Sequence, residues 1–372
     1  MAHAQLSPSA ADRWIACPAS VRVTKDLPNI SSPFAEEGTR AHSLGEFEAA
    51  KLLGLPKARR RPPSDDADMD EHAAEYARTI QRIVQQHSPG GLWLEQRVYT
   101  GIEGCWGTAD CVFVSDGHLY VIDLKYGRGI AVSPRNNSQL MLYGLGAMEL
   151  VGGIFGDVVD VHLCIYQPRI YRELQRWDTT ADRLREWRDS IRGTAADALA
   201  GSNVFKATEK GCRFCLAAGT CSVLAEYQAR NLMDLCDAAE MTPEELASTL
   251  EKAPSIRAWL DAVEAAALAR AVGGGDVPRH RLAVTGGRRY FPDQAAAGKA
   301  AVAAGADPDE VWTSTPKLAS QATLRTLLGR KRFREVLEPL LVKSEGKLAL
   351  VSEDSEAETY DPLDTMRHLT VE

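Results

Sequence analysis

The pattern of residues 104–143 constrains the fold more than any other part of the sequence. Two apolar segments, 105–114 and 118–125, predict neighbouring strands, and the second is apolar enough for the centre of a sheet. Between them, Ser115-Asp116-Gly117 predicts a hairpin turn, because Asp-Gly tolerates the positive φ angles that such a turn needs. A helix from Asn137 to Leu150 is expected to follow, so the segment is predicted to be a hairpin and then a helix.

The order of the remaining segments predicts an α/β fold. Before the hairpin, the pattern indicates helices at 6–18, 34–54 and 67–87 and a strand at 93–100. After it, the pattern indicates a strand at 157–167 and helices at about 179–200 and 222–238. Helices, hairpin strands, helix, strand and helix in this order predict a mixed sheet with helices on both faces, an α/β/α sandwich.

The composition changes at about residue 241. We expect a first domain over 1–240 and a mostly helical C-terminal accessory region over 241–372. In that region we expect two helices over 242–272, a basic hairpin over 279–291 and two short helices separated by Gly329. The basic and aromatic residues of the hairpin would bind strand phosphates and stack a base, or else guard an exposed strand edge. They are Arg279, Arg281, Arg288, Arg289, Tyr290 and Phe291.

The overall composition is that of an ordinary globular protein. The 372 residues carry a net charge of −8, with 45% hydrophobic and 25% charged residues. The acidic balance argues against a general polyanion binder but not against a local basic groove. No signal peptide is visible, and no apolar run approaches the roughly 18 residues of a membrane span, so we expect a cytoplasmic protein. In that reducing compartment the cysteines are expected to be metal ligands or core residues.

Three polar residues of the hairpin have the chemistry of a metal-dependent hydrolase. Asp123 and Lys125 lie two apart in a strand, so their side chains share one face, and Asp110 lies in the neighbouring strand. Two carboxylates bind Mg²⁺ or Mn²⁺, which acidifies water, and an ammonium beside the ion stabilises developing charge on a phosphate. This set suffices for phosphodiester hydrolysis. An Asp-x-Lys alone is also typical of a surface ion pair, and the sequence leaves the register between Asp110 and Asp123 open.

Two further pairs of polar residues have helical spacing. His42 and Glu46 lie four apart in the expected helix 34–54, so they project from one face. Taken alone they are typical of a surface pair, but an imidazole is also a common ligand for Mn²⁺-class ions. A helix packed on the sheet would deliver His42 to the metal. Gln139 and Tyr143 share one face of the helix after the hairpin in the same way.

These residues resemble, in their order, the motifs of the PD-(D/E)XK nucleases of the RecB-type branch. The matching motifs are Gly104-x-x-Gly107-x-x-Asp110, Ile122-Asp123-Leu124-Lys125, Gln139-x-x-x-Tyr143 and the helical Gly38-Thr39-x-x-His42-x-x-x-Glu46. The resemblance implies a PD-(D/E)XK core whose metal ligands are His42, Asp110, Asp123 and the carbonyl of Leu124. It also implies that Lys125 is the catalytic lysine and that Gln139 and Tyr143 orient the active site or the DNA strand. Glu46 is counted with this catalytic set through the histidine motif.

Four cysteines form a second constellation. Cys212-x2-Cys215-x5-Cys221 supplies three thiols, and a metal site made from them needs a fourth ligand. Cys17, at the end of a short helix before Pro18, is the plausible partner. The cysteines that fall in expected strands or in the expected helix 222–238 are Cys105, Cys111, Cys164 and Cys236. A zinc site and an iron–sulfur cluster both use four thiolates, although paired Cys-x2-Cys motifs would favour zinc and one such motif is present.

One distant N-terminal cysteine with three clustered C-terminal ones is similar to the iron–sulfur nucleases, such as the AddB-type subunit and the CRISPR-associated exonucleases. The resemblance implies a [4Fe–4S] cluster that clasps the two ends of the nuclease domain, with Zn²⁺ as the alternative. Its ligands would be Cys17, Cys212, Cys215 and Cys221. Under either interpretation the metal is structural, because it closes the long loop between the first two of these residues.

Nearly the whole chain also resembles a phage-encoded family of RecB-like proteins. The shared signatures are Ser7-Pro8-Ser9-x-x-x-Arg13-Trp14-x-x-Cys17-Pro18, Ala35-Glu36-x-Gly38-Thr39-x-Ala41-His42 and Leu328-Gly329-Arg330-Lys331-Arg332-Phe333. This resemblance implies a role in phage or prophage DNA recombination, replication or repair. A phage recombination protein or a single-strand-binding protein would then be a partner besides DNA.

The sequence thus leads to one main hypothesis and two alternatives. We expect a Mg²⁺- or Mn²⁺-dependent deoxyribonuclease, an exonuclease acting on DNA ends or single strands, with a structural cluster. We expect no membrane contact. The sequence is compatible with an oligomer but does not predict its size. The first alternative is a non-catalytic DNA-binding recombination scaffold that keeps the nuclease fold. The presence of Asp110, Asp123 and Lys125 together argues against it. The second alternative is a zinc-stabilised interaction module.

Overall fold

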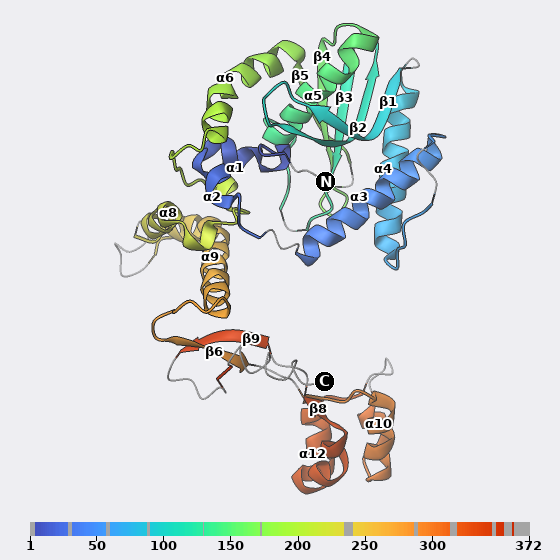
Figure 1. Ribbon diagram of the computed structural model, residues 1–372. Coiled ribbons are helices and arrows are strands. Elements are labelled where there is room, and N and C mark those ends of the chain that lie inside the picture. Colours follow the sequence, from blue (N-terminus) through green and yellow to red (C-terminus); the bar gives the residue numbers. More distant parts are fainter. Residues whose placement is uncertain are drawn as a thin grey trace, which may run out of the picture. The chain divides into compact units, whose positions relative to one another are not determined.

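The chain forms two compact units, Met1–Ala262 and Val263–Glu372. A computed structural model (Figure 1) describes residues 4–28, 32–56, 60–87, 90–128, 130–171, 173–233, 241–285, 289–312, 318–343, 347–352 and 359–360. The division between the units lies within helix α9 (Pro243–Val272). The expected boundary at residue 240 falls just before this helix and stays a prediction about domain organisation.

The first unit is built on a mixed five-stranded sheet in the order β1-β2-β3-β4-β5. Its strands are β1 (Gly91–Tyr99), β2 (Trp106–Ser115), β3 (His118–Leu124), β4 (Asp160–Tyr166) and β5 (Gln175–Thr180). β1, β2 and β3 are antiparallel neighbours, β4 is parallel to β3, and β5 is antiparallel to β4. Asp116 and Gly117 have positive φ in the tight turn between β2 and β3, so the predicted hairpin is confirmed.

Helices cover both faces of this sheet, which confirms the α/β/α class (Figure 1). On one face α3 (Pro33–Leu52) and α4 (Ala67–Gln85) bury a core with Phe113 and Ile122. On the other face α5 (Ser138–Phe155) and α6 (Ala181–Leu199) bury a core with Val112 and Val121. Neighbouring strand residues thus belong to opposite cores, as strand alternation requires. Helix α5 is also the crossover that the parallel β3–β4 pair needs.

The N-terminal segment packs beside residues that lie far along the chain. It contains η1 (Pro8–Ala10), α1 (Ala11–Ala16) and α2 (Ala19–Thr24), and α1 contacts α5, α6 and α7 (Glu209–Cys212). The elements η2 (Ala218–Thr220) and α8 (Ser222–Met233) follow α7. The first short helix expected from the sequence is therefore held against the cysteine-rich segment.

Strand β5 and helix α9 differ from the sequence-based expectation. Strand β5 was not expected, because Gln-Arg-Trp-Asp-Thr-Thr is a polar edge strand without the apolar run that marks a buried strand. The segment 242–272 was expected to form two helices, but Pro243–Val272 is one helix with Pro254 inside. A proline removes one backbone hydrogen bond and does not by itself end a helix whose flanking turns are rich in Ala, Leu and Glu.

Helix α5 meets the length and composition test for a membrane span. Its window Ser138–Phe155 has a mean hydropathy of 1.2, and 56% of it is buried inside the structure. The core helix of an α/β/α sandwich passes the same test, because both of its sides contact apolar layers. The buried residues of α5, which include Leu142 and Leu145, contact the sheet and α6.

The second unit has a small core of its own, with Phe291, Val311, Leu324 and Phe333 among its buried residues. Its helices are α10 (Gln294–Ala303), α11 (Pro308–Val311), α12 (Gln321–Arg332), η3 (Phe333–Leu337) and η4 (Glu338–Leu340). Its strands are β6 (His280–Thr285), β7 (Arg289–Tyr290), β8 (Val342–Lys343) and β9 (Lys347–Ser352). Gly329 has a φ of 72° at a kink in α12, where the sequence predicted a break.

The basic hairpin expected over 279–291 is wrong in its pairing. β6 pairs with β9 and β7 pairs with β8, so each strand finds a partner more than fifty residues away rather than its neighbour. The apolar run in Lys-Leu-Ala-Leu-Val-Ser of β9 supplies the partner of β6. Phe291 is buried and is not available to stack a base, whereas Tyr290 is exposed. Arg288 lies outside the described residues, as does Cys236.

Candidate metal centre

Three acidic side chains occupy one register position across the first three strands. The antiparallel register of β1 and β2 pairs Leu94 with Cys111 and Gln96 with Ala109, so Glu95 lies opposite Asp110. The last pair of β2 and β3 is Cys111 with Ile122, and one further step brings Asp110 opposite Asp123. The sequence left this register open. We call Glu95, Asp110 and Asp123 the carboxylate row.

The side-chain alternation of β1 and β2 breaks at this row. Leu94 and Val98 are four residues apart, which should place them on one face, yet they belong to opposite cores. The same break separates Ala109 from Cys111 in β2. Glu95 has a φ of 44°, a left-handed conformation that is unfavourable for a residue with a side chain. The local distortion therefore presents Glu95 toward α3 rather than toward α5.

His42 reaches the row from helix α3. Its Nδ1 atom lies 3.2 Å from Asp110 Oδ1 and 4.0 Å from Glu95 Oε1. Burial alone would lower the pKa of His42, but the nearby carboxylates, Asp110 above all, raise it to about 9. The imidazole is thus held as a cation by the same acidic oxygens that would otherwise attract a metal ion.

A bidentate ion pair fixes the start of α3. Arg169, which follows β4, donates hydrogen bonds of 2.6 and 2.9 Å to the Glu37 carboxylate and one of 3.1 Å to the backbone oxygen of Tyr126. Its guanidinium also lies 3.8 Å from the centre of the Tyr126 ring. Because Tyr126 directly follows Lys125, this cluster ties the helix that carries His42 to the end of β3.

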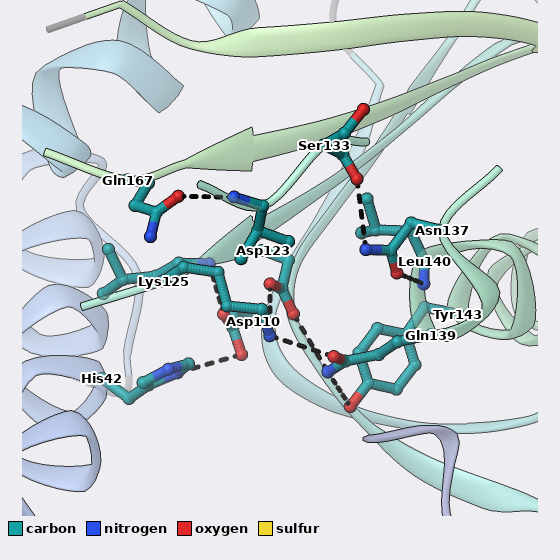
Figure 2. A network of polar contacts seen from close by, with 12 residues as sticks. His42, Asp110, Asp123, Lys125, Ser133, Asn137, Gln139, Leu140, Tyr143 and Gln167 are labelled. Carbon is teal, nitrogen blue, oxygen red and sulfur yellow. Dashed lines mark hydrogen bonds and ion pairs between the residues drawn. The ribbon is translucent and has the colours of Figure 1, made fainter. Parts of the chain in front are cut away.

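Asp123 faces α5 and contacts the side chains of Lys125 and Gln139, as Figure 2 shows. Lys125 Nζ lies 2.7 Å from Asp123 Oδ2 and donates a hydrogen bond of 3.0 Å to Gln139 Oε1. Gln139 Nε2 donates to Asp123 Oδ1 at 3.3 Å and lies 3.2 Å from the Tyr143 hydroxyl. Asn137 caps the helix by accepting a hydrogen bond from Leu140, which places Gln139 in the first turn.

Burial raises the electrostatic cost of this arrangement. Asp123 is 1% exposed, and burial raises the pKa of its carboxyl group, while Lys125 opposes that effect. Burial alone would lower the pKa of Lys125, but the Asp123 carboxylate outweighs it and raises the pKa above its usual value. The Lys125 ammonium at 2.7 Å is thus the cation that compensates the buried Asp123 Oδ2. A buried carboxylate oxygen needs such a cation beside it.

A close approach of β2 to α5 completes this side of the site. A Cβ atom added at Gly107 would lie 2.9 Å from Tyr143 Cε1 and 3.0 Å from Pro8 Cγ, so a larger residue would displace the ring. Gln167, 1% exposed, holds the loop after Lys125 by accepting from Val132 N and donating to the Ile130 oxygen.

One set of potential metal ligands stands out among the residues that the structure describes. Ligand atoms of His42, Glu95 and Asp110 all lie within 4.8 Å of one another. His42 and Asp110 were expected from the sequence, and Glu95 was missed. Glu95 could have been noticed as an acidic residue within a strand of alternating apolar residues. Its position opposite Asp110 could not be predicted without the register of β1 and β2. Glu46, one helical turn beyond His42, is half-buried and lies outside this set.

The four cysteines of the second constellation line one pocket. Cys17, Cys212, Cys215 and Cys221 surround it together with apolar residues such as Ala218 and Leu224. None of the four forms a disulfide. Burial raises the pKa of Cys212 and Cys215, so a metal would be needed to stabilise their thiolates. The backbone N–H of Thr208 already donates to Cys212 Sγ at 3.4 Å.

The pocket forms because α7 approaches α1 closely. A Cβ atom added at Gly211 would lie 3.0 Å from the backbone oxygen of Asp12 and 3.3 Å from Arg13 Cα, so the approach requires glycine. Cys105, Cys111 and Cys164 are buried in the sheet cores, as expected. Burial raises the pKa of Cys105 to about 11 and of Cys164 to about 12, which suits core thiols.

Comparison with solved structures finds several distant likenesses. A crystal structure of SSO0001 aligns over 60% of this chain and 88% of its own, with 13% identity and a TM-score of 0.28. The structure of LHK-Exo in complex with dAMP aligns over 51% and 91%, with 14% identity and a TM-score of 0.25. The structure of the alkaline exonuclease LHK-Exo from Laribacter hongkongensis aligns over 61% and 97%, with 13% identity and a TM-score of 0.24. At such TM-scores these likenesses carry no argument about this chain.

The sequence comparison is more extensive. Residues 3–358 match the family described as "Protein of unknown function (DUF2800)". The matched range covers both compact units, including the carboxylate row and the four-cysteine pocket. The chain therefore belongs to the DUF2800 family.

Proposed function

We propose that the protein is a Mg²⁺- or Mn²⁺-dependent deoxyribonuclease, an exonuclease that acts on DNA ends or single strands. The observation that carries the proposal is the carboxylate row, with His42 on the α3 side and Lys125 on the α5 side. Carboxylate oxygens are the ligands that Mg²⁺ prefers, and one imidazole suits Mn²⁺ as well. The order of the motifs along the chain supports the same function.

The residues present fit such an ion. Three ligand atoms from His42, Glu95 and Asp110 converge, and Asp123 Oδ2 is buried with the Lys125 ammonium 2.7 Å away. We propose Asp123 and the carbonyl of Leu124 as further ligands. When bound, the ion supplies Lewis acidity toward phosphate oxygens and lowers the pKa of water beside it. Because His42 is held protonated by its carboxylate neighbours, binding of the ion through its imidazole would release a proton.

The chain's own residues then supply the positioning and the positive charge. Lys125 keeps its ammonium protonated through Asp123, so it can stabilise charge that develops on a phosphate oxygen. Gln139 fixes the ammonium by accepting its hydrogen bond, and Tyr143 lies within hydrogen-bond distance of the Gln139 amide. We propose that Gln139 and Tyr143 orient the lysine and the scissile phosphate. We keep Glu46 in the proposed catalytic set, as an acidic residue one helical turn from His42.

We further propose that the four-cysteine pocket holds a [4Fe–4S] cluster rather than Zn²⁺. Cys17, Cys212, Cys215 and Cys221 line one pocket, so four thiols are available to one metal group. One distant N-terminal cysteine with three clustered ones, among which a single Cys-x2-Cys motif is present, supports the cluster.

The biological setting belongs to the same proposal. We propose a role in phage or prophage DNA recombination, replication or repair, which the motifs at 7–18, 35–42 and 328–333 support, and we propose that the protein acts in the cytoplasm. A phage recombination protein or single-strand-binding protein would be a partner besides DNA.

The test combines metal binding with digestion of labelled single- and double-stranded DNA. Wild type should bind Mn²⁺ and degrade DNA in Mn²⁺ or Mg²⁺ but not in EDTA. Asp123→Ala should lose both properties, whereas Lys125→Ala should still bind Mn²⁺ and lose cleavage by about 100-fold or more. DNA binding by wild type without cleavage in any metal would contradict the proposal and support the non-catalytic scaffold.

A further inference from the structure

The face of the β1–β2 ribbon that carries the metal centre continues beyond it as an exposed strip. Val98 of β1 and Ala109 of β2 belong to the core under α5, as does Cys105 just before β2. The residues next to them along each strand therefore point to the opposite face. Gly107 confirms this, because its added Cβ atom would meet Tyr143 of α5. The residues on the opposite face, which we call the β1–β2 strip, are Arg97, Tyr99, Trp106 and Thr108.

The strip starts directly beside the carboxylate row. Arg97 pairs with Thr108 and Tyr99 pairs with Trp106 in the same register that places Glu95 opposite Asp110. Since two residues of a strand rise about 6.8 Å, these pairs lie about 7 and 14 Å from the row. A polymer whose phosphate sits at the row would therefore extend its neighbouring residues along the strip.

The strip has both aromatic surface and free positive charge. Tyr99 is 61% exposed, and Trp106 is half-buried beside it. The Arg97 guanidinium lies 4.2 Å from the centre of the Trp106 ring, and Arg97 forms no ion pair with the residues that the structure describes. Arg169 is a contrast, since its guanidinium also covers an aromatic ring but is neutralised by Glu37. In a chain of net charge −8, an unneutralised arginine beside a metal centre is a local feature.

We propose that the β1–β2 strip binds the single-stranded DNA that flanks the scissile phosphate. Tyr99 stacks on a base, and Arg97, which lies over the Trp106 ring, contacts a phosphate. This inference rests on the proposed nuclease function and adds the substrate form, a single strand, to it. Stacking requires that a DNA base contact an exposed aromatic ring. The bases of a duplex are already paired and stacked on one another, so they cannot make this contact. Cross-strand pairs also stabilise a ribbon, but that role does not need Tyr99 to be largely exposed.

Binding of a labelled single-stranded oligonucleotide in EDTA tests the strip without cleavage. The double variant Tyr99→Ala/Trp106→Ala should bind about ten-fold more weakly or worse, and Trp106→Phe should bind like wild type because it keeps an aromatic ring under Arg97. The matched control is Arg183→Ala, whose guanidinium lies 5.5 Å from the Trp177 ring at the other edge of the sheet, and it should leave binding unchanged. Blunt duplex binding should change little in every variant.

Kinetic and unfolding measurements distinguish a loss of DNA binding from a loss of catalysis or of folding. In Mn²⁺ the double variant should raise KM for single strands by a similar factor with kcat nearly unchanged, and its thermal midpoint should stay close to that of wild type. Equal single-strand binding by the double variant and wild type would overturn the strip, as would an equal loss of duplex binding. A wild type that binds through the strip but never cleaves would instead overturn the nuclease function alone.

Discussion

The Asp110 carboxylate accepts a hydrogen bond of 2.7 Å from the backbone N–H of Leu124. This bond joins the end of β3 to β2 one step beyond their last ladder pair. It leaves Oδ1 of Asp110 facing His42, and it ties the backbone of Leu124 to Asp110. One carboxylate thus has two tasks in our proposal, because one oxygen holds the strand end and the other, beside His42, belongs to the proposed metal site.

Two substitutions of Asp110 should separate these tasks. Asp110→Asn keeps an acceptor for the Leu124 N–H, so unfolding by urea should change little. Asp110→Ala leaves a buried donor unpaired and should cost about 1–3 kcal/mol more. Both variants lose the ligand oxygen, and calorimetry should find at least ten-fold weaker Mn²⁺ binding in each. Equal stability of the two variants would contradict the structural task, and Mn²⁺ affinity retained in Asp110→Asn would contradict the ligand task.

Glu95 should trade backbone strain for metal binding. Its φ of 44° is unfavourable for glutamate but accessible to glycine, so Glu95→Gly should relieve about 1 kcal/mol of strain. We expect a thermal midpoint equal to or above that of wild type, together with weaker Mn²⁺ binding. Glu103→Gly, at a residue with no role in the site, is the control for metal binding. A variant that melts several degrees lower with normal Mn²⁺ affinity would contradict both parts.

The Glu37–Arg169 pair should make stability depend on pH. The hydrogen bond to Arg169 lowers the pKa of Glu37 below its usual value of 4.5. Its contribution is therefore complete above pH 4.5 and is lost as the pH falls through the lower folded-state pKa. Glu37→Gln should cost about 1–3 kcal/mol at pH 7 and progressively less below pH 4.5.

The matched control for this pair is Glu75→Gln. Glu75 pairs with Arg78 and Arg82 on an exposed face, so its loss should cost less than about 1 kcal/mol. Urea unfolding at several pH values measures both variants. Equal costs for the two substitutions at pH 7, or a cost for Glu37→Gln that does not shrink in acid, would show that the buried pair has no special role.

The four-cysteine pocket should bind iron through Cys17. Protein purified without oxygen should be brown, absorb near ~400 nm and contain iron and sulfide. Cys17→Ser should lose most of the iron and melt at a lower temperature, because Cys17 joins the N-terminal helices to the segment after α6. Cys105→Ala, in the sheet core, should keep the iron. A colourless wild-type protein that contains stoichiometric zinc would contradict the proposed iron–sulfur cluster.

Local patterns predicted the central part of the fold. The Asp-Gly turn between β2 and β3, the Asn137 cap and the four-residue spacing of Gln139 and Tyr143 each depend on nearby residues. The sequence therefore predicted that Asp123 and Lys125 share one face of their strand and that Gln139 and Tyr143 share one face of the following helix. His42 also followed from its helix, although its approach to Asp110 depends on how α3 packs.

Long-range and strained features could not be predicted in the same way. Glu95 joins the set of ligand atoms through the register of β1 and through its own positive φ, neither of which a strand pattern encodes. β6 and β7 pair with the late strands β9 and β8, since sheet pairing is decided by packing rather than by closeness in sequence. Strand β5 is polar because it lies at an edge, so it lacks the signal of a buried strand.

The most direct test of the central claim is the rate at which the protein cleaves labelled single-stranded DNA as Mn²⁺ is added. The account predicts no cleavage in EDTA, saturable activation by Mn²⁺ and a loss of at least about 100-fold in Asp123→Asn. Asp178→Asn, which alters an acidic residue bound to His162 and Arg176 elsewhere on the sheet, should cleave like wild type. Cleavage that persists in Asp123→Asn, or a wild type that stays inactive at every Mn²⁺ concentration, would contradict the account.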